Sequence, residues 1–128
     1  MSPNVDTAAT RYDRAFYEIR RAGSARSASV MLAVLFEWMR PASVVDIGCG
    51  EGHWLAAAKR LGAREILGLD GDYVDRESLV IPSECFRALD VAKPLEVDRS
   101  FELAICMEVA EHLEASDAPR FIASLTQL

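Results

Sequence analysis

The sequence has few cysteines and no long apolar run. Its three cysteines, Cys49, Cys85 and Cys106, are far apart and include no Cys-x-x-Cys pair, which favours reduced thiols over a disulfide framework or a zinc site. The longest apolar stretch, VMLAVLF, stops at Glu37 and is far too short for a membrane span. The first residues show no apolar signal-peptide core. We therefore expect a cytoplasmic protein without a membrane-bound segment.

Basic residues are in the minority. The chain of 128 residues carries 14 Lys and Arg against 20 Asp and Glu, a formal charge of −6, which disfavours electrostatic coating of nucleic acid. The balance is uneven, because residues 1–64 hold nine basic and six acidic side chains and residues 65–128 hold five and fourteen. Hydrophobic residues make up 51% of the chain, so a single domain with a substantial core is expected.

The N-terminal part of the sequence has a helical pattern. Residues 7–22 predict one helix, which Gly23 ends, and a second helix is predicted to begin at Ser24 or Ser27 and to end at Pro41. Four apolar residues are expected on the core face of the second helix: Ala28, Met31, Leu35 and Trp38.

Short apolar runs then alternate with helical segments. Strands are predicted at residues 43–47, 65–70, 84–89 and 101–107, and helices at 52–61, at 108–114 and from Ser116 onward. This order predicts an α/β fold, a Rossmann-like parallel sheet with helices on both faces. We divide the chain into N-terminal helices over residues 1–41, which could form a lid, and a sheet-forming part over residues 42–128.

The stretch VVDIGCGEGHW joins the first predicted strand to the following helix. Gly48, Gly50 and Gly52 lie where open α/β sheets bind ligands. A dinucleotide-binding loop would have its last glycine where His53 stands, and the carboxylate of Asp46 would repel a pyrophosphate. A cationic ligand suits Asp46 better, and S-adenosylmethionine, with a sulfonium and an ammonium group, is such a ligand.

Two further carboxylates follow the later strands. Asp70, at the end of the second predicted strand, could accept hydrogen bonds from the ribose hydroxyls of any adenosine cofactor. Asp90, after the third, could accept one from an adenine amino group. Because Asp70 suits either cofactor, it leaves nicotinamide dinucleotide and S-adenosylmethionine as alternatives, and the glycine loop favours the second.

Four segments resemble, in order, the motifs of the class I S-adenosylmethionine-dependent methyltransferases: VVDIGCGEG, LGLDGD, RALDVAKPL and FELAICMEVAEHLE. The first matches the family pattern (D/E)xGxGxG in full, and together they cover roughly residues 42–114. The resemblance implies a sheet of seven strands, of which this chain supplies about four. We therefore expect an incomplete sheet, with this chain as the N-terminal part of the domain.

The resemblance also implies which residues contact the cofactor. Asp46 would face its amino group, Asp70 would hold the ribose hydroxyls, and Asp90 and the Val91 amide would bind adenine. Seven further positions would line the donor closely: Gly48, Cys49, Gly50, Gly52, Gly71, Cys106 and Met107.

The segment after the fourth predicted strand carries a group of metal-ligand residue types. Glu108, Glu111 and His112 fall on one face of the predicted helix at positions i, i+3 and i+4. They could bind Mg²⁺ or Mn²⁺, which would activate an acceptor hydroxyl. Without a metal, His112 is a candidate general base. The alternative is that the two glutamates only border the pocket while His112 packs under the sheet.

The sequence thus predicts an S-adenosylmethionine-dependent methyltransferase that acts on a hydroxyl of a small molecule. The segment EVAEHLE is similar to small-molecule O-methyltransferases and also to small-RNA 2′-O-methyltransferases, and the acidic C-terminal half disfavours RNA. The alternative function is a non-catalytic S-adenosylmethionine-binding module or partner subunit. An incomplete sheet would leave an open edge, so we expect self-association through that edge and no turnover by this chain alone.

Overall fold

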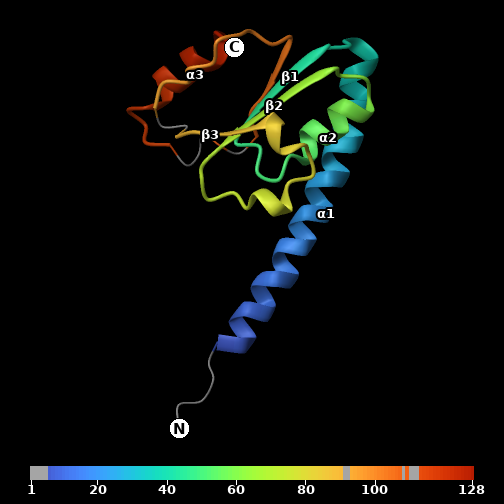
Figure 1. The fold of residues 1–128 in the computed structure, drawn as a ribbon, viewed down its shortest axis with the longest axis vertical. Helices are drawn as coiled ribbons and strands as arrows, with labels where there is room; N and C mark the ends of the chain where they lie inside the picture. The colour runs from blue at the N-terminus through green and yellow to red at the C-terminus, as the bar shows by residue number, and fades with distance from the viewer. Residues whose placement is uncertain (1–5, 91–92, 108, 110–112) are drawn as a thin grey trace.

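The fold is a parallel four-stranded sheet between helices (Figure 1). The computed structural model describes residues 6–90, 93–107, 109 and 113–128, without the side chains of residues 6–18 and 20. The strands are β1 (Ser43–Ile47), β2 (Glu65–Asp70), β3 (Phe86–Ala88) and β4 (Leu103–Ile105), in the order β3-β2-β1-β4, and each neighbouring pair is parallel. The predicted α/β fold class is confirmed.

Helices cover both faces of the sheet. The helices α1 (Asp6–Trp38) and α2 (His53–Arg60) lie on one face and α3 (Ala118–Thr126) on the other (Figure 1). Two short 3-10 helices, η1 (Arg76–Ser78) and η2 (Ser83–Cys85), lie between β2 and β3. The C-terminal half of α1 covers the sheet together with α2, whereas its N-terminal half extends away from the rest of the fold.

The alternation of side chains along β1 explains the two apolar layers. Val44 packs in the cluster that contains α1 and α2, whereas Val45 and Ile47 pack against Phe121 of α3. All three β1 side chains are 0% exposed. Because successive residues of a strand point to opposite faces, a strand with apolar residues at neighbouring positions needs cover on both sides.

The prediction that Gly23 separates two helices is wrong. A single helix, α1, runs from Asp6 to Trp38 and passes through Gly23. A glycine inside a helix costs about 1 kcal/mol relative to alanine, but unlike proline it removes no backbone donor. The turns after Gly23 pack against α2 and bury Ala28, Leu32 and Phe36 in the core, and such tertiary packing supplies most of the stability of a helix in a protein.

The predicted core face of this helix is also partly wrong. Ala28 is buried and Leu35 is half-buried as expected, but Met31 is 53% and Trp38 is 86% exposed. The sequence VMLAVLF is apolar on all sides of a helix, so its periodicity does not select the face that packs.

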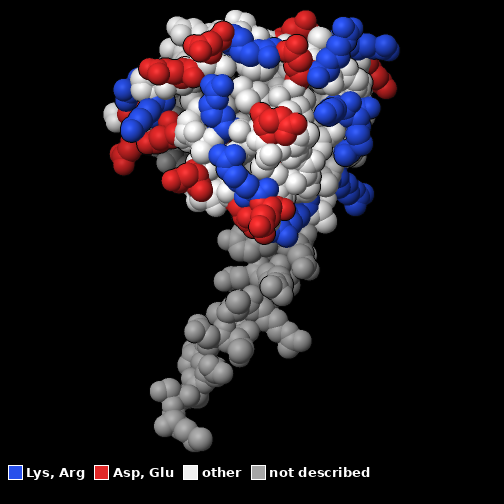
Figure 2. Space-filling model, viewed as in Figure 1, with Lys and Arg blue, Asp and Glu red and all other residues white. Residues whose placement is uncertain are grey.

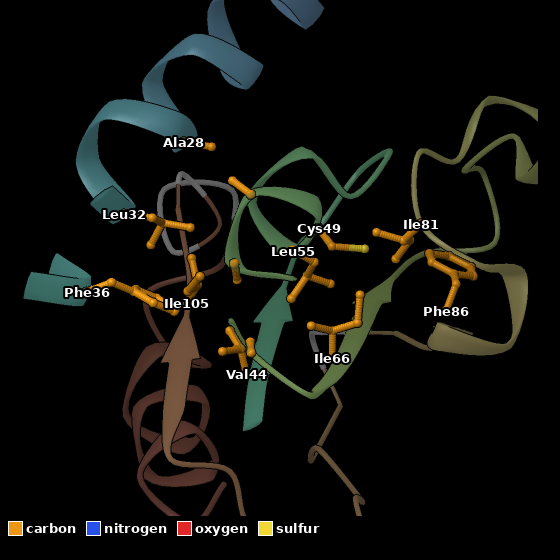
Figure 3. Close-up of a cluster of buried hydrophobic side chains, with 13 residues drawn as sticks. Ala28, Leu32, Phe36, Val44, Cys49, Leu55, Ile66, Ile81, Phe86 and Ile105 are labelled. Carbon is orange, nitrogen blue, oxygen red and sulfur yellow. The ribbon is translucent and has the colours of Figure 1, made fainter. Parts of the chain in front are cut away.

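The true core stripe of α1 follows a spacing of four residues. Ala28, Leu32 and Phe36 are buried, and Leu32 and Phe36 lie beside Ile105 of β4 (Figure 3). This stripe places the C-terminal half of α1 in the same core as the strands. The division of the chain at residue 41 and the role of the N-terminal segment as a lid stay predictions.

Replacing Gly23 by alanine is expected to raise the free energy of unfolding by about 0.5–1 kcal/mol, because alanine lowers the backbone entropy of the unfolded chain. A Cβ at this position meets no atom within 4 Å, so no clash opposes the gain. Urea unfolding followed by circular dichroism measures the change. A destabilised variant would contradict a continuous helix at Gly23.

The remaining elements agree with the sequence within a few residues. The predicted helix at 52–61 is α2, and the helix expected from Ser116 begins at Ala118. The four predicted strands are present, the last two shorter than expected. The helix predicted at 108–114 lies largely outside the described residues. Self-association through an open sheet edge stays a prediction.

Charged side chains of both signs are interspersed over the described part of the face seen in Figure 2. A nucleic-acid-binding surface is typically a continuous basic patch or stripe, and this face does not have that character. Among the helices that the structure describes, none combines the length and apolarity that crossing a membrane requires.

Candidate functional site

The loop from β1 to α2 lies at the carboxyl end of the sheet. The Gly48 and Cys49 N–H groups donate to the Leu69 carbonyl at 2.7 and 3.2 Å, which attaches the loop to the end of β2. The Gly52 N–H donates to the Cys49 carbonyl at 3.0 Å, and Gly52 is the N-cap of α2. The chain therefore turns sharply at the edge where open parallel sheets bind ligands.

The three glycines of this loop have different surroundings. A Cβ at Gly48 would lie 2.2 Å from Val109 Cγ2, and one at Gly52 would lie 2.8 Å from Ile81 Cγ1. A Cβ at Gly50 would meet no atom within 4 Å. Neighbouring protein atoms therefore exclude side chains at Gly48 and Gly52, and Gly50 is the loop position where space remains for a ligand.

Asp70, the last residue of β2, is the most heavily hydrogen-bonded carboxylate near the loop. Its Oδ2 accepts from the Gly50 N–H at 2.7 Å, and its Oδ1 accepts from the Gly71 N–H at 2.7 Å. The Tyr73 hydroxyl also donates to Oδ1, and this bond, with partial burial, raises the pKa of Tyr73 to about 12. Asp70 is only 5% exposed. The two backbone donors fix the orientation of its carboxylate.

Asp46 lies on β1 opposite Gly68 of β2 and is 2% exposed. No hydrogen bond to its carboxyl group comes from the residues that the structure describes. Burial, and secondly the charge of Asp70, raises its pKa from 3.8 to about 8. This shift favours the protonated form of the carboxyl group, and a cation placed beside it would favour the ionised form.

The two predicted cofactor-lining cysteines lie close to these carboxylates. A Cβ on Gly68 would be 2.7 Å from Cys49 Sγ, so Gly68 makes room for the Cys49 side chain. Burial, followed by the charges of Asp46 and Asp70, raises the pKa of the Cys49 thiol, and burial followed by Asp46 raises that of Cys106. Both thiols are neutral at physiological pH and are poor nucleophiles.

A cavity of about 490 Å³ opens at the ends of β2 and β3, which is within the usual size of small-molecule sites. The Leu89 N–H donates to the Asp70 carbonyl at 2.8 Å and holds the two strand ends together. Seven residues line the cavity: Asp70, Gly71, Asp72, Tyr73, Ala88, Leu89 and Asp90. Three of them are carboxylic acids, which disfavours a pyrophosphate and admits a neutral or cationic ligand.

Comparison with known proteins decides the family. Residues 14–128 match a family described as a methyltransferase domain. The chain belongs to this methyltransferase family. The matched region contains the glycine loop, Asp46, Asp70 and the cavity, so the site lies within this methyltransferase domain.

One relative matches about half of the chain. A segment of 68 residues is 37% identical to an uncharacterized protein of Methanocaldococcus jannaschii. The segment covers 53% of this chain and 26% of the relative. The chain therefore spans about a quarter of the length of this relative.

The structure describes most of the predicted site residues, and four of them lie outside the described part of the chain. Met107 is 43% exposed and follows β4, and Asp90 lines the cavity. Four predicted residues lie outside the described part of the chain: Val91, Glu108, Glu111 and His112. Among the residues that are described, no group of three or more His, Cys, Asp and Glu could hold a metal ion. The metal site and the general base stay predictions.

Two features of the site were not predicted from the sequence. The first is Tyr73, whose hydroxyl binds Asp70. The signal that could have found it is an aromatic residue three positions after a strand-end aspartate. The second is an ion pair between Arg21 Nε of α1 and Glu51 Oε1 of the glycine loop at 2.7 Å. His53 Nε2 lies 3.9 Å from the same Glu51 oxygen, buried and without a hydrogen-bond partner in the described structure.

Proposed function

We propose that this methyltransferase domain binds S-adenosylmethionine at the carboxyl ends of β1 and β2, as the cofactor-binding part of an enzyme that methylates a hydroxyl group of a small molecule. The observation that carries the proposal is the pair of buried carboxyl groups at these strand ends. Asp70 is held rigidly by two backbone amides, and Asp46 lies beside it with no hydrogen bond from the described residues.

Asp70 is suited to the ribose of the cofactor. A carboxylate can accept from both hydroxyls of a ribose, and such charge-assisted hydrogen bonds are strong. The Gly50 and Gly71 N–H groups hold it in orientation before any ligand arrives. Pre-organisation of this kind lowers the entropy cost of binding.

Asp46 is suited to the positive charge of the cofactor. Its raised pKa shows that burial disfavours the lone anion. A bound cation would supply the missing counter-charge, whereas a pyrophosphate would add repulsion. This difference supports S-adenosylmethionine over a nicotinamide dinucleotide.

The bound cofactor would supply a methyl group on a sulfonium, open to in-line displacement by an acceptor oxygen. The residues of this chain would bind and orient the cofactor and exclude water from it, which are the main requirements of such a displacement. Charges of both signs are interspersed on the face seen in Figure 2, which disfavours a nucleic acid bound to that face.

The proposal is tested by titration calorimetry with S-adenosylmethionine, S-adenosylhomocysteine and NAD. We expect the purified chain to bind the first two and not NAD. Replacing Asp70 by alanine should weaken binding of S-adenosylhomocysteine by about 10- to 100-fold, as expected for charge-assisted hydrogen bonds. Replacing Asp98, an exposed carboxylate, by alanine is the control and should leave the affinity unchanged.

Tight binding of NAD, or full affinity in the Asp70→Ala variant, would overturn the proposal. Binding of S-adenosylmethionine by the whole protein without methyl transfer to any acceptor would favour the non-catalytic alternative.

A further inference from the structure

A neighbouring side chain already donates a hydrogen bond to Asp70. The Tyr73 hydroxyl donates to Asp70 Oδ1, the carboxylate to which we assign the ribose. The Tyr73 ring lies close over Gly71, because a Cβ at Gly71 would be only 2.2 Å from Tyr73 Cε1. The absence of a side chain at Gly71 therefore allows the phenol to reach Asp70.

The Asp70 carboxylate has few acceptor positions left for a ligand. An ionised carboxylate has about four lone-pair sites for donors. The N–H groups of Gly50 and Gly71 and the hydroxyl of Tyr73 occupy three donor positions on Asp70. One position is left, whereas a ribose brings two hydroxyl groups. Asp70 cannot accept from both ribose hydroxyls until one of its present donors leaves.

Tyr73 is the donor that can leave most easily. The two amides belong to the backbone at the glycine loop and at the end of β2, so their movement would disturb the sheet edge. Tyr73 is 79% exposed, so rotation of its side chain uncovers little apolar surface. Rotation of an exposed side chain is also fast, on a picosecond to nanosecond scale.

We propose that Tyr73 is a positioning residue that occupies the ribose position on Asp70 in the free protein and releases it when the nucleoside binds. The proposal rests on the proposed function, because it assigns the ribose to Asp70. Tyr73 thereby lowers the affinity for any ligand that carries a ribose diol.

The test is the affinity of the Tyr73→Phe variant for S-adenosylhomocysteine. Phenylalanine keeps the ring over Gly71 and removes the competing hydroxyl. We expect binding about 3- to 10-fold tighter than in the parent, since one net hydrogen bond no longer has to be broken. The matched control is Trp38→Phe, which changes an aromatic residue that is 86% exposed on α1 and should leave the affinity unchanged.

A ligand without the ribose hydroxyls separates competition from a general structural effect. The 2′,3′-dideoxy form of S-adenosylhomocysteine should bind the parent and the Tyr73→Phe variant equally. A gain for S-adenosylhomocysteine alone supports the proposal, whereas an equal gain for both ligands, or no gain for either, overturns it. If neither ligand binds even the parent, the proposed function fails, and the role of Tyr73 fails with it.

A spectroscopic measurement follows Tyr73 in the parent protein. The chain has three tyrosines, so 3-fluorotyrosine labelling gives few resonances, and the one missing from Tyr73→Phe is that of Tyr73. S-adenosylhomocysteine should shift this resonance strongly as the hydroxyl leaves Asp70, and the dideoxy ligand should shift it much less. An unshifted Tyr73 resonance at saturating S-adenosylhomocysteine would overturn the proposal.

Discussion

Replacing Gly50 by valine is expected to abolish binding of S-adenosylhomocysteine, with a loss of more than about 100-fold. Gly50 has φ +54°, a left-handed conformation that a β-branched residue rarely adopts. Its N–H anchors Asp70 Oδ2, so a change of backbone conformation also disturbs the carboxylate. A side chain would extend into the space that the loop leaves open. Calorimetry measures the affinity, and far-UV circular dichroism checks that the fold is retained.

The control for this variant is Gly62→Val. Gly62 follows α2 and has φ +117°, and a Cβ there, as at Gly50, would meet no atom within 4 Å. Both substitutions therefore introduce backbone strain of about 1–3 kcal/mol without a steric clash. Gly62→Val should lose stability and keep its affinity for the ligand. If Gly50→Val also keeps full affinity, the glycine loop is only a turn.

The second large effect concerns Asp46 and the dependence of stability on pH. The pKa of Asp46 is raised from 3.8 to about 8 by burial and by Asp70. Between these values the folded protein binds more protons than the unfolded chain, so the free energy of unfolding falls as the pH rises from about 4 to about 8. Above that range the contribution is constant. At high pH the folded parent must bury the negative charge of Asp46. The Asp46→Asn variant has no such charge.

We therefore expect Asp46→Asn to become more stable relative to the parent as the pH rises. At about 1.4 kcal/mol per pH unit, the difference in unfolding free energy should grow by about 4 kcal/mol between pH 5 and pH 9. Urea unfolding of both proteins at each pH measures this difference. Asp98→Asn, at an exposed carboxylate, serves as the control and should show no comparable growth. A difference that does not change with pH would mean that Asp46 is ionised in the folded protein at pH 5.

The same linkage connects stability with ligand binding. A cationic ligand should favour the ionised form of Asp46, so its binding should release a proton below about pH 8. A stabilising Asp46→Asn substitution that weakens cofactor binding would fit the general observation that functional sites keep destabilising groups.

The sequence by itself determined the strands, the glycine loop and the position of its carboxylates. The runs SVVDI and EILGLD form β1 and β2. A short apolar run that is followed by glycine is typical of a buried strand that ends in a turn. In a parallel sheet the carboxyl ends of neighbouring strands meet at one edge. The order of strands and helices was therefore enough to bring Asp46 and Asp70 to the same edge.

Tertiary structure decided the features that depend on contacts between distant residues. An apolar segment such as VMLAVLF could pack by any face, and packing against α2 and β4 selected Leu32 and Phe36 over Met31 and Val34. The crowding of Gly48 by Val109 and of Gly52 by Ile81 joins positions far apart in the chain. The raised pKa of Asp46 likewise depends on its burial in the folded protein. Local sequence patterns carry no information about such contacts, because they arise only when separate elements pack together.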